Sequence, residues 1–192
     1  PSDEDCNRCI VERPNHLQLD IGDWRSLFSS HFANADRVIC PTRYVARVIA
    51  EYFPTLTTQV LPHPEPRSGV PSEYAKQTRS RLKVAIVGGL TPIKGLDLVE
   101  AVIRQAELED LPVDFVIIGF TTRPFYAGCR AAVTGPYSRA ELPNILVRER
   151  PDCFLFLPQI PETFAYTLSA CLATGLPIVA KALGALEERL EN

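Results

Sequence analysis

Residues 82–89 read Leu82-Lys83-Val84-Ala85-Ile86-Val87-Gly88-Gly89. The run is almost continuously apolar, as in a strand buried on both faces of a parallel sheet, and it ends abruptly in two glycines. A second run of this kind, at 113–119, follows a segment with helical periodicity at 96–109. Strand, helix and strand in this order predict a right-handed crossover, and therefore a parallel sheet.

The same alternation continues towards the end of the sequence. It predicts strands at 132–135, 153–157 and 178–180, with helices at 141–149 and 163–174 between them. Residues 187–189 are predicted to begin a solvent-facing helix. The fold class is therefore α/β, with a Rossmann-like, doubly wound parallel sheet.

A shorter unit precedes this sheet. A helical pattern begins at Asp23, a short strand is predicted at 37–40, a helix follows with Thr42 as its N-cap, and a strand returns at 59–61. The proline-rich segment that comes next is typical of a linker. The predicted divisions are residues 1–62, a linker at 63–80 and residues 81–192.

Composition limits the class of protein. Of the 192 residues, 46% are hydrophobic and 22% are charged, as in ordinary globular domains. The formal net charge of −3 argues against binding to nucleic acid. No apolar run approaches the roughly 18 residues of a transmembrane helix, so we expect a cytoplasmic protein. Peripheral association with a membrane is compatible with this expectation. The sequence begins at Pro1 and contains no methionine, which predicts a piece of a longer protein.

The six cysteines favour neither a disulfide framework nor a metal site. Only Cys6 and Cys9 have ligand-like spacing, and a structural zinc site needs about four ligands, usually as two such pairs. We therefore expect no metal, and reduced thiols near a frayed chain end. Cys40, Cys153 and Cys171 lie in apolar runs and are predicted to be small core residues.

Ligands of doubly wound sheets bind at the carboxyl ends of the strands. There Gly88 and Gly89 allow a sharp turn, and Lys94 follows near the start of a helix, which suits a diphosphate. Such a turn with a nearby lysine also occurs for purely structural reasons. Glu162 lies in a proline-bounded loop at the same predicted edge, where it either binds sugar hydroxyls or only stabilises the next helix.

The order of these segments resembles the donor domain of the retaining GT-B glycosyltransferases, of the group 1 or family 4 type. The matching segments are Gly88-Gly89-Leu90, Lys94-Gly95, Pro161-Glu162-Thr163-Phe164 and Gly175-Leu176-Pro177-Ile178-Val179-Ala180. Residues 35–42 and 60–64 resemble the end of the partner, acceptor-side domain. The resemblance implies a two-domain GT-B protein, of which both domains are incomplete here.

The resemblance also implies roles for individual residues. Lys94 and Glu162 would be the catalytic pair, with Lys94 neutralising the donor diphosphate and Glu162 contacting the transferred sugar. Backbone amides near Phe164 and Ala165 would approach the phosphates. The full donor-binding set is Gly88, Gly89, Lys94, Glu162, Thr163, Phe164 and Ala165. The implied partners are a nucleotide diphosphate sugar and a glycan or lipid-linked acceptor, without a cofactor or a metal, in polysaccharide biosynthesis.

The sequence departs from the family pattern at two positions. Gly89 replaces the usual arginine after the first glycine, and Ala170 replaces the second glutamate of the paired-glutamate motif. These departures favour an alternative, a non-catalytic nucleotide-sugar binding module of a larger glycan-assembly protein. A dinucleotide-dependent oxidoreductase is disfavoured, because Gly88-Gly89 is not the Gly-x-Gly-x-x-Gly fingerprint.

Overall fold

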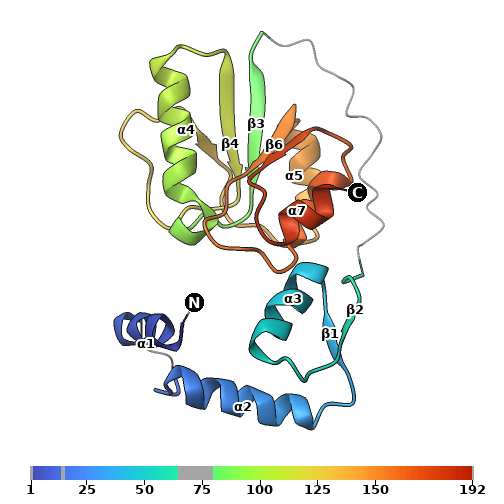
Figure 1. The fold of residues 1–192 in the computed structure, drawn as a ribbon. Helices are drawn as coiled ribbons and strands as arrows, with labels where there is room; N and C mark the ends of the chain where they lie inside the picture. The colour runs from blue at the N-terminus through green and yellow to red at the C-terminus, as the bar shows by residue number, and fades with distance from the viewer. Residues whose placement is uncertain (1, 14–15, 65–79, 192) are drawn as a thin grey trace. The chain divides into compact units, whose positions relative to one another are not determined.

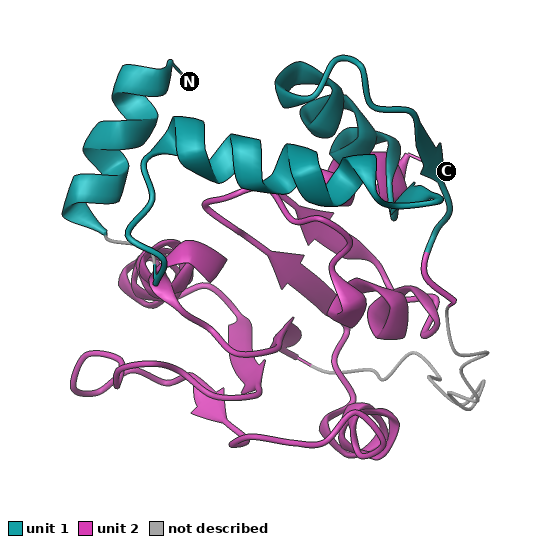
Figure 2. Cartoon of the chain, turned by 90° about the horizontal axis from the view of Figure 1, so that it is seen from below, with its two compact units in different colours: residues 1–62 teal, residues 63–192 magenta. Residues whose placement is uncertain are grey.

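A computed structural model describes residues 2–13, 16–64 and 80–191 (Figure 1). The chain divides into two units, residues 1–62 and residues 63–192 (Figure 2). Most of the predicted linker, residues 65–79, lies outside the described residues. Each unit is considered by itself below.

The second unit contains a parallel five-stranded sheet in the order β5-β4-β3-β6-β7. Its central pair aligns Leu82 with Val113 and Val87 with Ile118, so β3 and β4 end at the same level. This sheet confirms the predicted α/β fold class. The strands are β3 (Leu82–Val87), β4 (Val113–Ile118), β5 (Ala132–Val133), β6 (Cys153–Phe156) and β7 (Ile178–Ala180).

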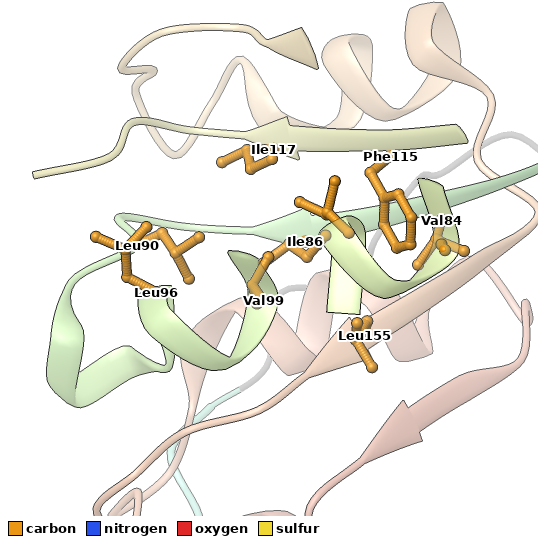
Figure 3. Close-up of a cluster of buried hydrophobic side chains, with 10 residues drawn as sticks. Val84, Ile86, Leu90, Leu96, Val99, Phe115, Ile117 and Leu155 are labelled. Carbon is orange, nitrogen blue, oxygen red and sulfur yellow. The ribbon is translucent and has the colours of Figure 1, made fainter. Parts of the chain in front are cut away.

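Helices cover both faces of this sheet, as the alternating side chains of β3 require. Val84 and Ile86 belong to a buried cluster with α4 residues (Figure 3), whereas Ala85 and Val87 belong to a second cluster with residues of α5 and α6. The sheet is therefore doubly wound. The helices of this unit are the 3₁₀ helix η1 (Pro92–Lys94), α4 (Leu96–Leu108), α5 (Leu142–Glu149), α6 (Tyr166–Leu172) and α7 (Ala185–Leu190).

The packing of α4 shows why its sequence forms a helix on the sheet. Its buried residues are Leu96, Val99, Ile103 and Ala106, which recur at helical spacing along one face. Burial of each of the large aliphatic side chains contributes about 1.5–3 kcal/mol, so this stripe fixes the first crossover.

The first unit contains a second, two-stranded parallel sheet. The Thr42 hydroxyl accepts a hydrogen bond from the Val45 N–H at 3.2 Å, which confirms Thr42 as an N-cap. No helix in the described part of the chain is long and apolar enough to span a membrane. The elements are α1 (Asp3–Glu12), α2 (Ile21–Ala33), β1 (Val38–Cys40), α3 (Arg43–Tyr52) and β2 (Thr58–Val60).

Three local expectations were wrong. The Cys6–Cys9 segment is not frayed but lies in α1, whose start is stabilised by a capping box between Ser2 and Asp5. Helix α6 begins at Tyr166 rather than at residue 163, because the preceding residue has left-handed backbone angles. Helix α7 begins at Ala185, before residues 187–189.

The carboxyl ends of β3 and β4 meet where only glycine fits. Gly119 follows β4 with φ 144°, and a Cβ atom there would lie 2.1 Å from the Gly88 carbonyl oxygen. Backbone atoms cannot move aside as a side chain can. The turn after β4 therefore requires both the conformational freedom and the absent side chain of glycine.

We expect Gly119→Ala to lower the free energy of unfolding by about 3 kcal/mol, since left-handed strain costs about 1–2 kcal/mol and overpacking about 1–3 kcal/mol. Gly135 is the matched control, because it has φ 88° with no atom within 4 Å of a built Cβ. Gly135→Ala should cost only the strain, about 1–2 kcal/mol. Urea denaturation followed by circular dichroism measures both values, and equal losses would contradict the steric argument.

Candidate functional site

The candidate site lies where the strand order reverses. From the central strand β3, the chain proceeds outwards to β4 on one side and later to β6 and β7 on the other. The crossovers diverge at the carboxyl ends of β3 and β6, which is the usual ligand crevice of such sheets. A cavity of about 130 Å³ lies at this point. It is lined by residues 86–90, Lys94, residues 155–158, Glu162, Ala165 and Thr167.

Lys94 and Glu162, which are 68 positions apart in the sequence, form an ion pair in the cavity wall. Lys94 ends η1, where its N–H donates to the Thr91 hydroxyl at 3.3 Å. The Glu162 backbone is fixed by α7, because the Ala185 N–H donates to the Glu162 carbonyl at 2.9 Å. The cation and the carboxylate that the sequence predicts at this site, Lys94 and Glu162, therefore meet where the strand order reverses, at the carboxyl ends of β3 and β6.

The ion pair is partly open to solvent. The Lys94 side chain is 43% exposed and that of Glu162 is 18% exposed. Solvent-accessible ion pairs contribute about 0.2–1 kcal/mol, far less than several charge-assisted hydrogen bonds to a diphosphate. An anionic ligand can therefore displace Glu162 from Lys94 at small cost.

The glycine turn also lines the cavity. Gly88 has φ 119° and donates its N–H to the Ile118 carbonyl at 2.9 Å. For the Gly89 N–H, no acceptor is found among residues 2–13, 16–64 and 80–191. Since buried or half-buried amides are normally paired, this N–H is suited to donate to a ligand.

The space beside Gly89 is occupied by an aromatic ring. A Cβ atom on Gly89 would lie 2.7 Å from Cζ of Phe120, whose backbone carbonyl accepts the Leu90 N–H at 2.8 Å. Phe120 is 46% exposed. An apolar ring therefore stands where the family arginine would emerge, and a larger side chain at position 89 would have to displace it.

The loop before α6 contains the remaining predicted residues. Ala165 lines the cavity and has φ 61°, which is rare for a residue with a side chain. Thr163 is exposed and Phe164 is 2% exposed, and neither lines the cavity. Phe164 instead packs against Tyr166, with ring centroids 5.3 Å apart.

Sequence reasoning missed the contribution of Thr167. Its side chain lines the cavity in the first turn of α6, and its methyl group would be 3.5 Å from a Cβ on Gly88. Ala170, one turn further, packs against the buried cluster that contains Leu146 and Phe154. Position 170, where the paired-glutamate motif would have its second glutamate, is therefore in an apolar environment.

The cysteines take no part in this site. Cys40 and Cys171 are buried, and burial raises the pKa of the Cys171 thiol, which keeps it neutral. Cys153 is half-buried. Within the described ranges, no cluster of three or more His, Cys, Asp or Glu side chains is arranged to hold a metal ion.

No protein-family model matches the sequence, and no curated protein matches it significantly. Solved structures do match the fold. Anabaena HepE in complex with UDP and glucose has a TM-score of 0.64 at 18% identity, over 91% of this chain and 52% of HepE. A Staphylococcus aureus TarM variant in complex with fondaparinux, α-GlcNAc-glycerol and UDP has a TM-score of 0.67 at 13% identity, over 91% of this chain and 36% of TarM. Sucrose-phosphate synthase from Thermosynechococcus elongatus has a TM-score of 0.59 at 15% identity, over 95% of this chain and 50% of the synthase.

These neighbours have the GT-B glycosyltransferase fold, which is therefore the fold of this chain. The chain spans about half the length of HepE and of sucrose-phosphate synthase, and about a third of TarM. At these identities the likeness establishes the fold alone.

The left-handed backbone of Ala165 generates a prediction. Ala165→Gly should raise the free energy of unfolding by about 1 kcal/mol, because glycine adopts φ 61° without strain. The control is Ala101→Gly, at an exposed position inside α4, where glycine should instead cost about 0.5–1 kcal/mol. Urea unfolding curves give both changes, and a destabilised Ala165→Gly would refute the strain.

Proposed function

We propose that the chain contains the donor-binding side of a glycosyltransferase, which moves a sugar from a nucleotide diphosphate sugar to a glycan or other acceptor with retention. The observation that carries this proposal is the Lys94–Glu162 ion pair in the cavity between β3 and β6. The pair offers a cation for a diphosphate and a carboxylate for sugar hydroxyls at one place. UDP complexes of GT-B neighbours support the choice of ligand class.

The cavity size limits which part of the donor enters it. Its volume of about 130 Å³ is below the roughly 300–1,000 Å³ of ordinary ligand pockets. In this proposal the cavity takes the diphosphate and the sugar, while the nucleoside lies outside it. Lys94 turns from Glu162 to the diphosphate, and Glu162 then accepts hydrogen bonds from the sugar.

The proposed catalytic contribution is electrostatic. When the bond between the sugar and the diphosphate breaks, negative charge grows on the leaving phosphate and positive charge grows on the sugar. Lys94 and the Gly89 N–H stabilise the leaving group, and the Glu162 carboxylate favours the positively charged sugar. The charge of the diphosphate is met by these groups without a metal in the proposed scheme.

Phe120 beside Gly89 and the apolar packing of Ala170 favour the second candidate, a non-catalytic nucleotide-sugar binding module. The resemblance implies an arginine at position 89 and a glutamate at position 170, so two charged side chains are missing from the site. The two functions differ in turnover. Release of nucleoside diphosphate that depends on an acceptor indicates the transferase, whereas saturable donor binding without such release indicates the module.

The ion pair makes the donor proposal testable by titration calorimetry with UDP. Lys94→Met should weaken UDP binding by about tenfold or more, since a charged hydrogen bond contributes about 1.5–3 kcal/mol. Glu162→Gln should leave UDP binding intact or stronger, because Lys94 loses its competing partner, but should remove the added affinity for UDP-glucose.

Lys83→Met is the matched control for this test. Lys83 also forms an ion pair, with Glu149 at 3.0 Å, but it lies at the start of β3, at the opposite edge of the sheet. This variant should bind UDP like the parent chain. Unchanged UDP affinity in Lys94→Met would exclude Lys94 from the donor site.

Phe120 makes a second prediction about the same wall. Gly89→Arg alone should gain less UDP affinity than the double variant below, because the exposed Phe120 ring must first turn out of the space that the new side chain needs. Gly89→Arg combined with Phe120→Ala should strengthen UDP binding by about tenfold, the effect of one added charged hydrogen bond. Phe120→Ala alone serves as the control. Equal affinity in the single and double arginine variants would show that the ring does not obstruct position 89.

A further inference from the structure

Arg189 of α7 reaches back to the loop that precedes α6. Its Nη1 donates to the Phe164 carbonyl at 2.7 Å and to the Ala165 carbonyl at 3.0 Å, and its Nη2 donates to the Ser169 hydroxyl at 3.0 Å. The side chain was expected on a solvent-facing helix, but it is half-buried. The guanidinium group therefore links α7 to both the loop and α6.

An aromatic contact fixes the same guanidinium group from a second direction. Its Cζ lies 4.0 Å from the ring centroid of Phe164, and that ring is 2% exposed. A planar guanidinium can stack on a ring and donate from its edge at the same time, whereas a lysine ammonium cannot. The contacts thus depend on arginine and not on positive charge alone.

The carbonyls that Arg189 holds belong to the strained part of the loop. Ala165 has φ 61°, and a non-glycine residue keeps such angles only when its surroundings impose them. The Ala165 carbonyl also accepts the Leu168 N–H at 3.0 Å, in the first turn of α6. Its direction consequently sets the start of α6, where Thr167 lines the cavity.

Helix α7 also holds the loop at its other end. The Ala185 N–H bonds to the Glu162 carbonyl, and Glu162 pairs with Gly184 in an isolated parallel bridge. The segment from Glu162 to Ala165 is therefore fixed at both ends by one helix. The side chain of Glu162, at the first of these ends, reaches Lys94.

We infer that Arg189 is a positioning residue of the donor site, which holds Ala165 in its left-handed conformation and so places Glu162 and Thr167 along the cavity wall. This inference rests on the proposed function for its ligand. The arginine itself touches neither the cavity nor the proposed reacting atoms. It acts through the backbone of the loop.

The test compares Arg189→Lys in two backgrounds, the parent chain and Ala165→Gly. In the parent background, Arg189→Lys should speed the amide exchange of Leu168, followed by NMR, by about tenfold or more, because the Ala165 carbonyl is released. It should also weaken UDP-glucose binding by about tenfold, with UDP binding changed less. In the Ala165→Gly background both losses should shrink to about threefold or less, since glycine needs no support at φ 61°.

The matched control is Arg148→Lys, at an exposed arginine of α5 that pairs with the neighbouring Glu149. It should change neither the exchange of Leu168 nor the binding of UDP-glucose. Equal losses from Arg189→Lys in both backgrounds would overturn the inference, because they would indicate general support of α7. An unchanged Leu168 exchange rate would overturn it as well.

The outcomes separate this inference from the proposed function. If the parent chain binds neither UDP nor UDP-glucose, the donor proposal fails, and the exchange rates still decide whether Arg189 holds Ala165. If the parent chain binds both ligands but the two backgrounds respond alike, the donor proposal stands and the positioning role fails.

Discussion

The parallel pairing of β3 with β4 on one side and with β6 on the other is the constraint on which the rest of the second unit depends. Because the strands run in the same direction, the turns that follow them all lie at the carboxyl ends of the strands and crowd together there. Gly119 lies against the Gly88 carbonyl, and a Cβ on Gly95 would lie 1.9 Å from the Leu157 carbonyl. Glycine is needed at these contacts because backbone meets backbone. The cavity forms between turns that are packed this closely.

The ion pair between Lys94 and Glu162 follows from that crowding. Each residue is on a different crossover, and only the shared edge of β3 and β6 brings them together. In the chain without ligand, the ion pair contributes only modest stabilisation, because both side chains retain contact with water. Under the proposed function, a ligand with a phosphate end and a hydroxyl end would replace both halves of the pair at once, which would link recognition of its two parts.

The walls beside this pair differ in character from what the family resemblance implies. Phe120 covers Gly89, and Ala170 packs in an apolar cluster, so neither position supplies a charge. The strained Ala165 is held by Arg189, which comes from the last helix of the chain. Backbone geometry and one ion pair, rather than a full set of charged groups, therefore define this candidate site.

The sequence predicted the α/β class and the alternation of strands and helices along the chain through its apolar periodicity, and Thr42 as an N-cap through its residue type, because these depend on neighbours within a few residues. It also placed Lys94 and Glu162 at the same edge. Only the tertiary structure decided that these two residues touch, that Phe120 fills the space at Gly89, and that Arg189 turns towards Ala165. The reason is physical: such contacts join residues from different crossovers, and their geometry is set by how those crossovers pack on the sheet, which no local pattern encodes.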